Sequence, residues 1–115
     1  MSNMQFEAKT YAGDVQILKR LPFEGIAITL DFTNVVATDS ATGYKVVKAG
    51  TPIDKDGVAA NTSSAIGILL FDVLETRPQG TILKKAYLNT AVAEEHSGIT
   101  YDAAVKAALP MIVFE

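Results

Sequence analysis

The chain contains no cysteine and no tryptophan, and His96 is its only histidine. The lack of cysteine excludes disulfide bonds and thiolate metal sites. Aromatic residues make up only 8% of the chain, which is little for a protein that stacks sugars on aromatic rings. Apolar residues make up 49% of the 115 residues, so a single core has to stabilise the chain alone or with help from partner subunits.

Charge and hydropathy also exclude several classes of partner. Ten basic and thirteen acidic residues give a net charge of −3, and they are spread along the chain without a basic block. We therefore expect no nucleic-acid partner. The first residues lack the basic and apolar regions of a signal peptide, and no apolar run approaches the roughly 18 residues of a membrane span. The sequence thus predicts a protein that is made and kept in the cytosol, or in something assembled there, with no membrane partner.

Alternation of apolar and polar residues is the main pattern in the first half of the chain. Residues 25–32 place Ile26, Ile28, Leu30 and Phe32 on one face, as a half-buried strand requires. A weaker strand is expected at 14–19, where Pro22 closes it, and another at 44–48, after a turn-like segment at 38–43. The strands at 25–32 and 44–48 are expected to form a hairpin or a wide loop.

Two further strands are expected in the second half of the chain. Residues 66–71 are apolar on both faces, which indicates either a core strand or a strand covered by a neighbouring subunit. Residues 81–88 follow the turn at 78–80 and carry Lys84 and Lys85 in mid-strand. These lysines indicate an edge strand or a solvent-facing surface.

One short helix is expected near the C-terminus. Thr100 is the expected cap, Asp102 lies in the first turn, Tyr101, Val105 and Ala108 recur at helical spacing, and Pro110 ends the helix. A last strand follows at 111–114, and 89–96 is a candidate second helical turn. The sequence therefore predicts a mainly β fold with one short C-terminal α-helix. We divide the chain into an N-terminal arm, residues 1–12, and a single β-rich domain, residues 13–115.

Residues that catalyse reactions or bind metals are few and scattered. His96 follows two glutamates, but a metal site needs at least three convergent ligands, so we expect a surface loop there. Asp54-Lys55-Asp56-Gly57 resembles the beginning of a calcium loop, but the later ligands are missing and a β-turn is expected. Ser63 and Ser64 lack the surroundings of a nucleophile. We expect no catalytic, cofactor-binding or metal-binding residue.

The segment 48–72 carries the most specific pattern in the chain. It reads Lys48-Ala-Gly-Thr-Pro-Ile53, then Asp56-Gly57, then Ala65-Ile-Gly-Ile-Leu69 with Asp72 after it. This pattern resembles the central part of tailed-phage head decoration proteins and the related phage head-fibre proteins. The likeness extends more loosely through 80–88 and 102–114, so it covers about residues 44–115. The residues that carry the family signature are Gly50, Thr51, Pro52, Gly57, Gly67, Ile68 and Leu69. We expect Pro52 and Gly57 to shape a bend, and Gly67 to allow close packing of the apolar strand.

The resemblance implies a β-clip-like fold of bent antiparallel ribbons. It also implies a homotrimer on the outer surface of the virion, where it binds the major capsid protein and ties neighbouring capsid subunits together. No enzyme activity, cofactor or small-molecule substrate is implied. In such proteins the N-terminal arm often adds a strand to the capsid protein, and Phe6, Tyr11 and Val15 are the candidate contact residues here.

Two other classes of function remain open at this point. One is another phage or bacterial structural module, either a tail component or a β-rich adhesion domain that binds carbohydrate. The other is a small enzyme or cofactor-binding domain. The single histidine, the missing cysteine and the lack of a convergent pair of acids disfavour this last class.

Overall fold

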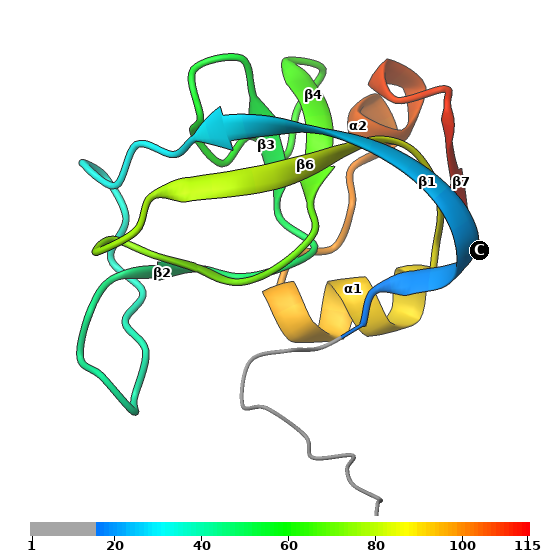
Figure 1. Ribbon diagram of the computed structural model, residues 1–115. Coiled ribbons are helices and arrows are strands. Elements are labelled where there is room, and N and C mark those ends of the chain that lie inside the picture. The colour runs from blue at the N-terminus through cyan, green and yellow to red at the C-terminus, as the bar shows by residue number, and fades with distance from the viewer. Residues whose placement is uncertain (1–15) are drawn as a thin grey trace, which may run out of the picture.

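The computed structural model describes residues 16–115, which form a mainly β fold with two short helices (Figure 1). The predicted mainly β class is therefore confirmed. The strands are β1 (Leu18–Thr29), β2 (Val46–Val47), β3 (Pro52–Asp54), β4 (Ala65–Leu69), β5 (Val73–Leu74), β6 (Gln79–Leu88) and β7 (Ile112–Phe114). The helices are α1 (Thr90–Ser97) and α2 (Ala103–Ala108).

The main sheet is built around β6. Its strand order is β1-β6-β4-β3, and β7 also pairs with β6. β6 is long enough for β4 and β7 to share one of its edges, since Leu83 pairs with Ile68 of β4 while Ala86 pairs with Ile112 of β7. All pairs are antiparallel except β6 with β7. β2 and β5 form a separate two-stranded sheet.

Apolar side chains fill both faces of the main sheet. Neighbouring residues of a strand point to opposite faces, so Ile68 and Leu69 of β4 enter two different clusters. The first cluster includes Ala93 of α1 and Val105 of α2. The second is closed by Leu30, Val47, Ile53 and Val73. Burial within the chain thus accounts for the doubly apolar segment at 66–70, whereas Phe71 remains 48% exposed.

The strand β1 is longer than the sequence indicated. The expected strand at 14–19 and the expected strand at 25–32 belong, within the described residues, to one strand that ends at Thr29. Pro22 does not close it, because it lies in the irregular stretch between Arg20 and Glu24, where no residue of β6 is paired with it. The expected apolar face is only partly correct, since Leu30 is buried but Ile26 is exposed.

One expectation about strand pairing is wrong, and of the two alternatives given for Lys84 and Lys85 only one holds. β2 pairs with β5, and the expected hairpin between 25–32 and 44–48 does not form. β6, which carries Lys84 and Lys85, is the central strand of the sheet and not an edge strand. The lysines nevertheless face solvent, as the second part of that expectation stated. The Lys84 Nζ also donates a hydrogen bond to the Ile66 carbonyl of β4, at 2.7 Å.

The helices correct the expectation of a single short helix. The candidate helical turn at 89–96 is α1, which begins after Asn89, whose side chain accepts a hydrogen bond from the Val92 amide. The C-terminal helix α2 is capped by Asp102 and not by Thr100. Asp102 has an extended backbone and its carboxylate accepts from the Ala104 amide, which is the geometry of an N-cap.

The family-signature residues lie on β3 and β4, in the segment before β3 and in the turn after it. The bend of this segment falls at Gly50, whose φ of 94° favours glycine, whereas Pro52 is already the first residue of β3. The expected bend at Pro52 is therefore wrong, while Gly57 does lie in a turn, with φ of 79°. A Cβ atom on Gly67 would lie 2.7 Å from the Leu83 carbonyl oxygen of β6. This close approach confirms the packing role expected of Gly67.

Candidate functional site

An open cleft of about 570 Å³ lies between the loop after β1, β2, the turn after β3 and the end of α1. Eight aliphatic side chains line it: Val35, Val36, Ala37, Val46, Val47, Val58, Ala59 and Ile99. Val36 is 90% exposed at the rim. Most of the exposed lining is apolar, which suits an apolar group from a binding partner, although polar and charged residues also line the cleft.

Charged residues lie at the edges of this cleft. Asp31 and Glu95 contribute carboxylates, and Lys48 contributes an ammonium group. Hydrogen bonds from the side chain and the amide of Thr33 lower the pKa of Asp31 below its ordinary value of 3.8. Asp31 is therefore ionised at neutral pH, and the cleft residues Asp31, Glu95 and Lys48 together carry a net negative charge.

His96 also lines the cleft, on the last turn of α1. Its Nε2 lies 2.7 Å from Oδ1 of Asp72, and the same oxygen accepts a hydrogen bond from the Ala49 amide at 2.8 Å. The expected surface loop at His96 is therefore wrong. Asp72 connects α1 to the segment before β3, so the pair fixes one wall of the cleft.

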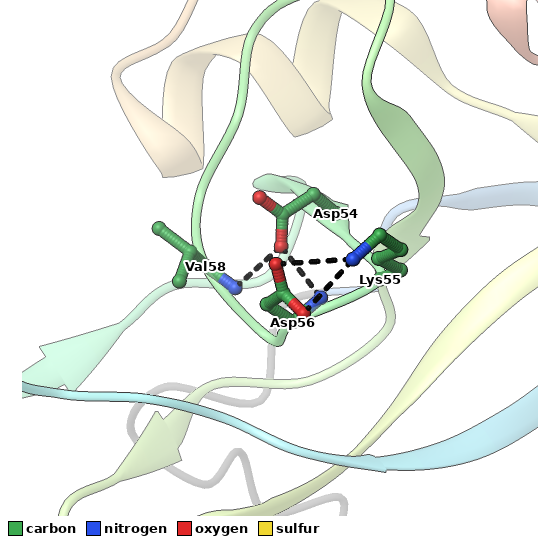
Figure 2. A network of polar contacts seen from close by, with 4 residues as sticks. All are labelled: Asp54, Lys55, Asp56 and Val58. Atoms are coloured by element: carbon green, nitrogen blue, oxygen red, sulfur yellow. Dashed lines mark hydrogen bonds and ion pairs between the residues drawn. The ribbon is translucent and has the colours of Figure 1, made fainter.

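The segment at Asp54 forms a turn, as the sequence predicted (Figure 2). Oδ1 of Asp54 accepts hydrogen bonds from the amides of Asp56 and Val58, at 2.9 and 3.1 Å. The Asp56 carboxylate points instead toward the Lys55 ammonium, at 3.3 Å, and both side chains are exposed. One carboxylate thus closes the turn and the other makes a surface ion pair.

Tyr101 is a buried tyrosine that supports the segment before β3. Its hydroxyl donates a hydrogen bond of 2.6 Å to the Gly50 carbonyl. Burial, and to a smaller extent the charge of Glu94, raises the pKa of Tyr101 well above its ordinary value of 10.0. The hydroxyl therefore keeps its proton at neutral pH and acts as a hydrogen-bond donor that holds the Gly50 bend in place.

The outer edge of β1 is a second candidate surface. Within residues 16–115, β1 pairs only with β6, so its other edge is open. The register shifts between the pairs Arg20–Tyr87 and Glu24–Lys85, where β1 has two more residues than β6. Leu21 and Phe23 lie in this bulge and are 69% and 39% exposed. Exposed apolar groups beside an open strand edge are typical of protein–protein contact surfaces.

The predicted contact residues and signature residues have different outcomes. Phe6, Tyr11 and Val15 of the arm lie outside the described residues. Of the seven signature residues, Pro52, Ile68 and Leu69 are fully buried, and Thr51 is the member that lines the cleft. The signature residues therefore pack within the fold or lie in its turns.

Sequence reasoning missed the β1 bulge and the contact between Asp72 and His96. The bulge had a signal, since Leu21-Pro22-Phe23 places two large apolar residues around a proline. The contact joins residues 24 positions apart, and no local pattern connects them.

No group of three His, Asp or Glu side chains within residues 16–115 is arranged to hold a metal ion. Neither of the two helices in this range is long and apolar enough to cross a membrane. Comparison with protein-family models and with curated protein sequences finds no match for this chain.

Proposed function

We propose that the protein decorates the outer surface of a bacteriophage head, where it binds the lattice of the major capsid protein as a homotrimer. The protein would then be made in the host cytoplasm and reside on the virion. The resemblance of residues 44–115 to head decoration and head-fibre proteins supports this proposal. The mainly β fold is compatible with this role. We include a β-clip-like arrangement of the strands in the proposal.

The observation that carries the proposal is the open edge of β1. This strand is exposed from Lys19 to Ala27, and Leu21, Phe23 and Ile26 present apolar groups along an edge with which no other strand of residues 16–115 pairs. A decoration protein needs such surfaces because it attaches to other proteins and not to a small molecule.

Attachment to a repeating lattice compensates for weak individual contacts. In a trimer, three identical arms engage three symmetric positions, and each contact after the first forms at a high effective concentration. We assign the contact with the capsid protein to the arm, where Phe6, Tyr11 and Val15 would anchor an added strand.

The experiment that tests this proposal is cosedimentation with undecorated heads of the same phage. The full chain should pellet with the heads and saturate at a fixed ratio to capsid protein. A Phe6→Ser/Tyr11→Ser variant should require a higher concentration, while Phe71→Ser, which changes an exposed phenylalanine outside the arm, should bind like the wild type.

Heads that bind none of the protein at any concentration would refute the proposal. Clear hits on a glycan array would instead favour the carbohydrate-binding adhesion domain.

A further inference from the structure

The bulge of β1 forms an apolar projection, which we call the knob and define as Leu21, Pro22 and Phe23. Four residue steps of β1, from Arg20 to Glu24, lie opposite two steps of β6. The extra residues leave the regular ladder, as they do in β-bulges generally, and the proline carries no N–H to pair. A strand from another protein therefore cannot pair regularly with β1 at the knob. The side chains of the knob form a separate apolar contact surface.

The cleft described above offers a concave surface of matching chemistry. Its aliphatic walls come from the loop after β1, from β2 and from the end of α1, and Val36 stands at the rim. An exposed leucine and phenylalanine would lose water on entering it, and apolar burial is worth about 25 cal per mol for each Å² removed from water.

The knob of a chain cannot reach the cleft of the same chain. Phe23 and the cleft residue Asp31 are eight positions apart along extended backbone, which corresponds to about 26 Å at roughly 3.3 Å per residue. The knob lies across β6 from β7, because Arg20 pairs with Tyr87 and Tyr87 pairs with Val113. β7 and β2 lie at opposite ends of the molecule in Figure 1. Only another molecule can bring such a knob to this cleft.

Charge complementarity points to a second copy of this chain as that molecule. Around the knob, Arg20 is already paired with Glu115 at 2.5 Å, and Lys19, Glu24 and Lys85 remain. These three residues carry a net positive charge. The cleft residues Asp31, Glu95 and Lys48 carry a net negative charge. Opposite potentials favour approach in this orientation over knob-to-knob or cleft-to-cleft contact.

We propose that the knob of one copy packs into the cleft of the next copy, so that copies join head to tail. A contact between two different surfaces is heterologous, and it forms a closed ring when the rotation between copies closes. The number of copies in the ring, three, rests on the proposed function, whereas the contact itself rests on the two surfaces.

Two variants test the contact, each by changing one exposed side chain. Phe23→Ser removes the aromatic group of the knob, and Val36→Asp places a carboxylate at the rim of the cleft. Phe71→Ser is the matched control, because Phe71 is 48% exposed and belongs to neither surface. Mass in solution is measured by sedimentation equilibrium up to about 1 mM, which detects even weak association.

The wild type and Phe71→Ser should associate to a mass about three times that of the 12.3-kDa chain. Phe23→Ser and Val36→Asp should each raise the dissociation constant at least about tenfold, as the loss of a central aromatic or the burial of a charge does. A wild-type chain that stays monomeric, or a trimer that neither variant weakens, overturns the proposal.

Mixing the variants identifies the contact directly. The Val36→Asp chain keeps its knob and the Phe23→Ser chain keeps its cleft, so the two should form a pair with one intact contact. Unlabelled Val36→Asp chain should shift the amide resonances of nitrogen-15-labelled Phe23→Ser chain at the cleft, including Val47 and Ile99. A double variant carrying both changes should shift none of them. Shifts that are absent, or that occur elsewhere, contradict the contact.

The results can refute the proposed function and the proposed contact independently of each other. Head binding that persists while Phe23→Ser leaves the trimer intact refutes the contact alone. Loss of trimers in both variants, together with wild-type protein that binds no heads, refutes the decoration role alone.

Discussion

At the scale of single residues, Gly67 shows how closely two strands of the main sheet approach one another. A Cβ atom there would lie 2.7 Å from the Leu83 carbonyl and 3.1 Å from side-chain atoms of Ile82. The Leu83 carbonyl belongs to the central strand β6, so it has little freedom to move. Sequence alone identified this glycine because it interrupts an apolar strand, where a missing side chain indicates close backbone approach.

Replacing Gly67 by alanine should therefore destabilise the fold by about 2–3 kcal/mol, the upper range for overpacking a core. Gly43→Ala is the matched control, because nothing lies within 4 Å of its Cβ position and only its φ of 79° opposes a side chain. Backbone strain of that kind costs about 1 kcal/mol. Urea denaturation measures both values. Equal losses in the two variants would show that the approach at Gly67 is not tight.

Tyr101 makes the stability of the fold sensitive to alkaline pH. Its pKa is raised in the folded state, so above the ordinary value of 10.0 the unfolded chain loses a proton that the folded chain retains. Stability is unaffected below that pH. Above it, this group lowers the free energy of unfolding by up to about 1.4 kcal/mol per pH unit.

Tyr101→Phe should remove this contribution to the pH slope. At neutral pH it should cost about 1 kcal/mol, because the Gly50 carbonyl loses its donor. Denaturation curves between pH 8 and about 11.5, where a raised pKa has its effect, measure both quantities. Tyr44→Phe, at an exposed tyrosine, should keep the wild-type slope. A Tyr101→Phe variant with an unchanged slope would contradict the role of burial.

At the scale of elements, the carboxylates of Asp54 and Asp56 have different roles in the turn after β3. Asp54→Ala should cost about 1–2 kcal/mol, because the amides of Asp56 and Val58 lose their acceptor. Asp56→Ala should cost less than about 0.5 kcal/mol, because an exposed ion pair contributes little. Thermal unfolding of the two variants measures the difference. Calcium should leave the wild-type unfolding temperature unchanged, and a clear rise would restore the calcium-loop alternative.

The elements that sequence analysis predicted correctly are those set by local patterns. The strand expected at 66–71, which is β4 (Ala65–Leu69), the strand that becomes β6 and the helix before Pro110 are all present. The sequence reasoning failed for the bounds of β1, and for the strand at Lys84 it left the choice between an edge and a solvent-facing surface open, because whether a strand lies at an edge is decided by its partners. Pro22 ends a strand only where its missing N–H would break a ladder, and between Arg20 and Glu24 it has no partner in the ladder with β6.

The candidate surfaces depend even more on tertiary structure. Leu21 and Phe23 form the knob only because β6 offers fewer partners than β1 has residues. The cleft joins the segments around residues 35, 47, 58 and 97, and no local pattern brings these together. The contact of Asp72 with His96 is likewise a consequence of packing α1 beside the loop that precedes β5.

At the scale of the whole molecule, the two clusters of the core are filled within one chain, whereas the apolar knob and cleft remain exposed. The protein therefore does not need a partner to complete its core in residues 16–115. Its exposed apolar groups are therefore better explained as surfaces that contact other proteins than as unfilled parts of the core. On this account, the knob and the cleft join the copies, and the arm joins the trimer to the head.

Cryo-electron microscopy of heads saturated with the full chain tests the decoration role most directly. The account predicts added density on the outer capsid surface, at symmetry-related positions, with three copies of the fold in each feature. Capsids whose outer surface stays bare at saturating concentration, or density found only at the tail, would contradict it.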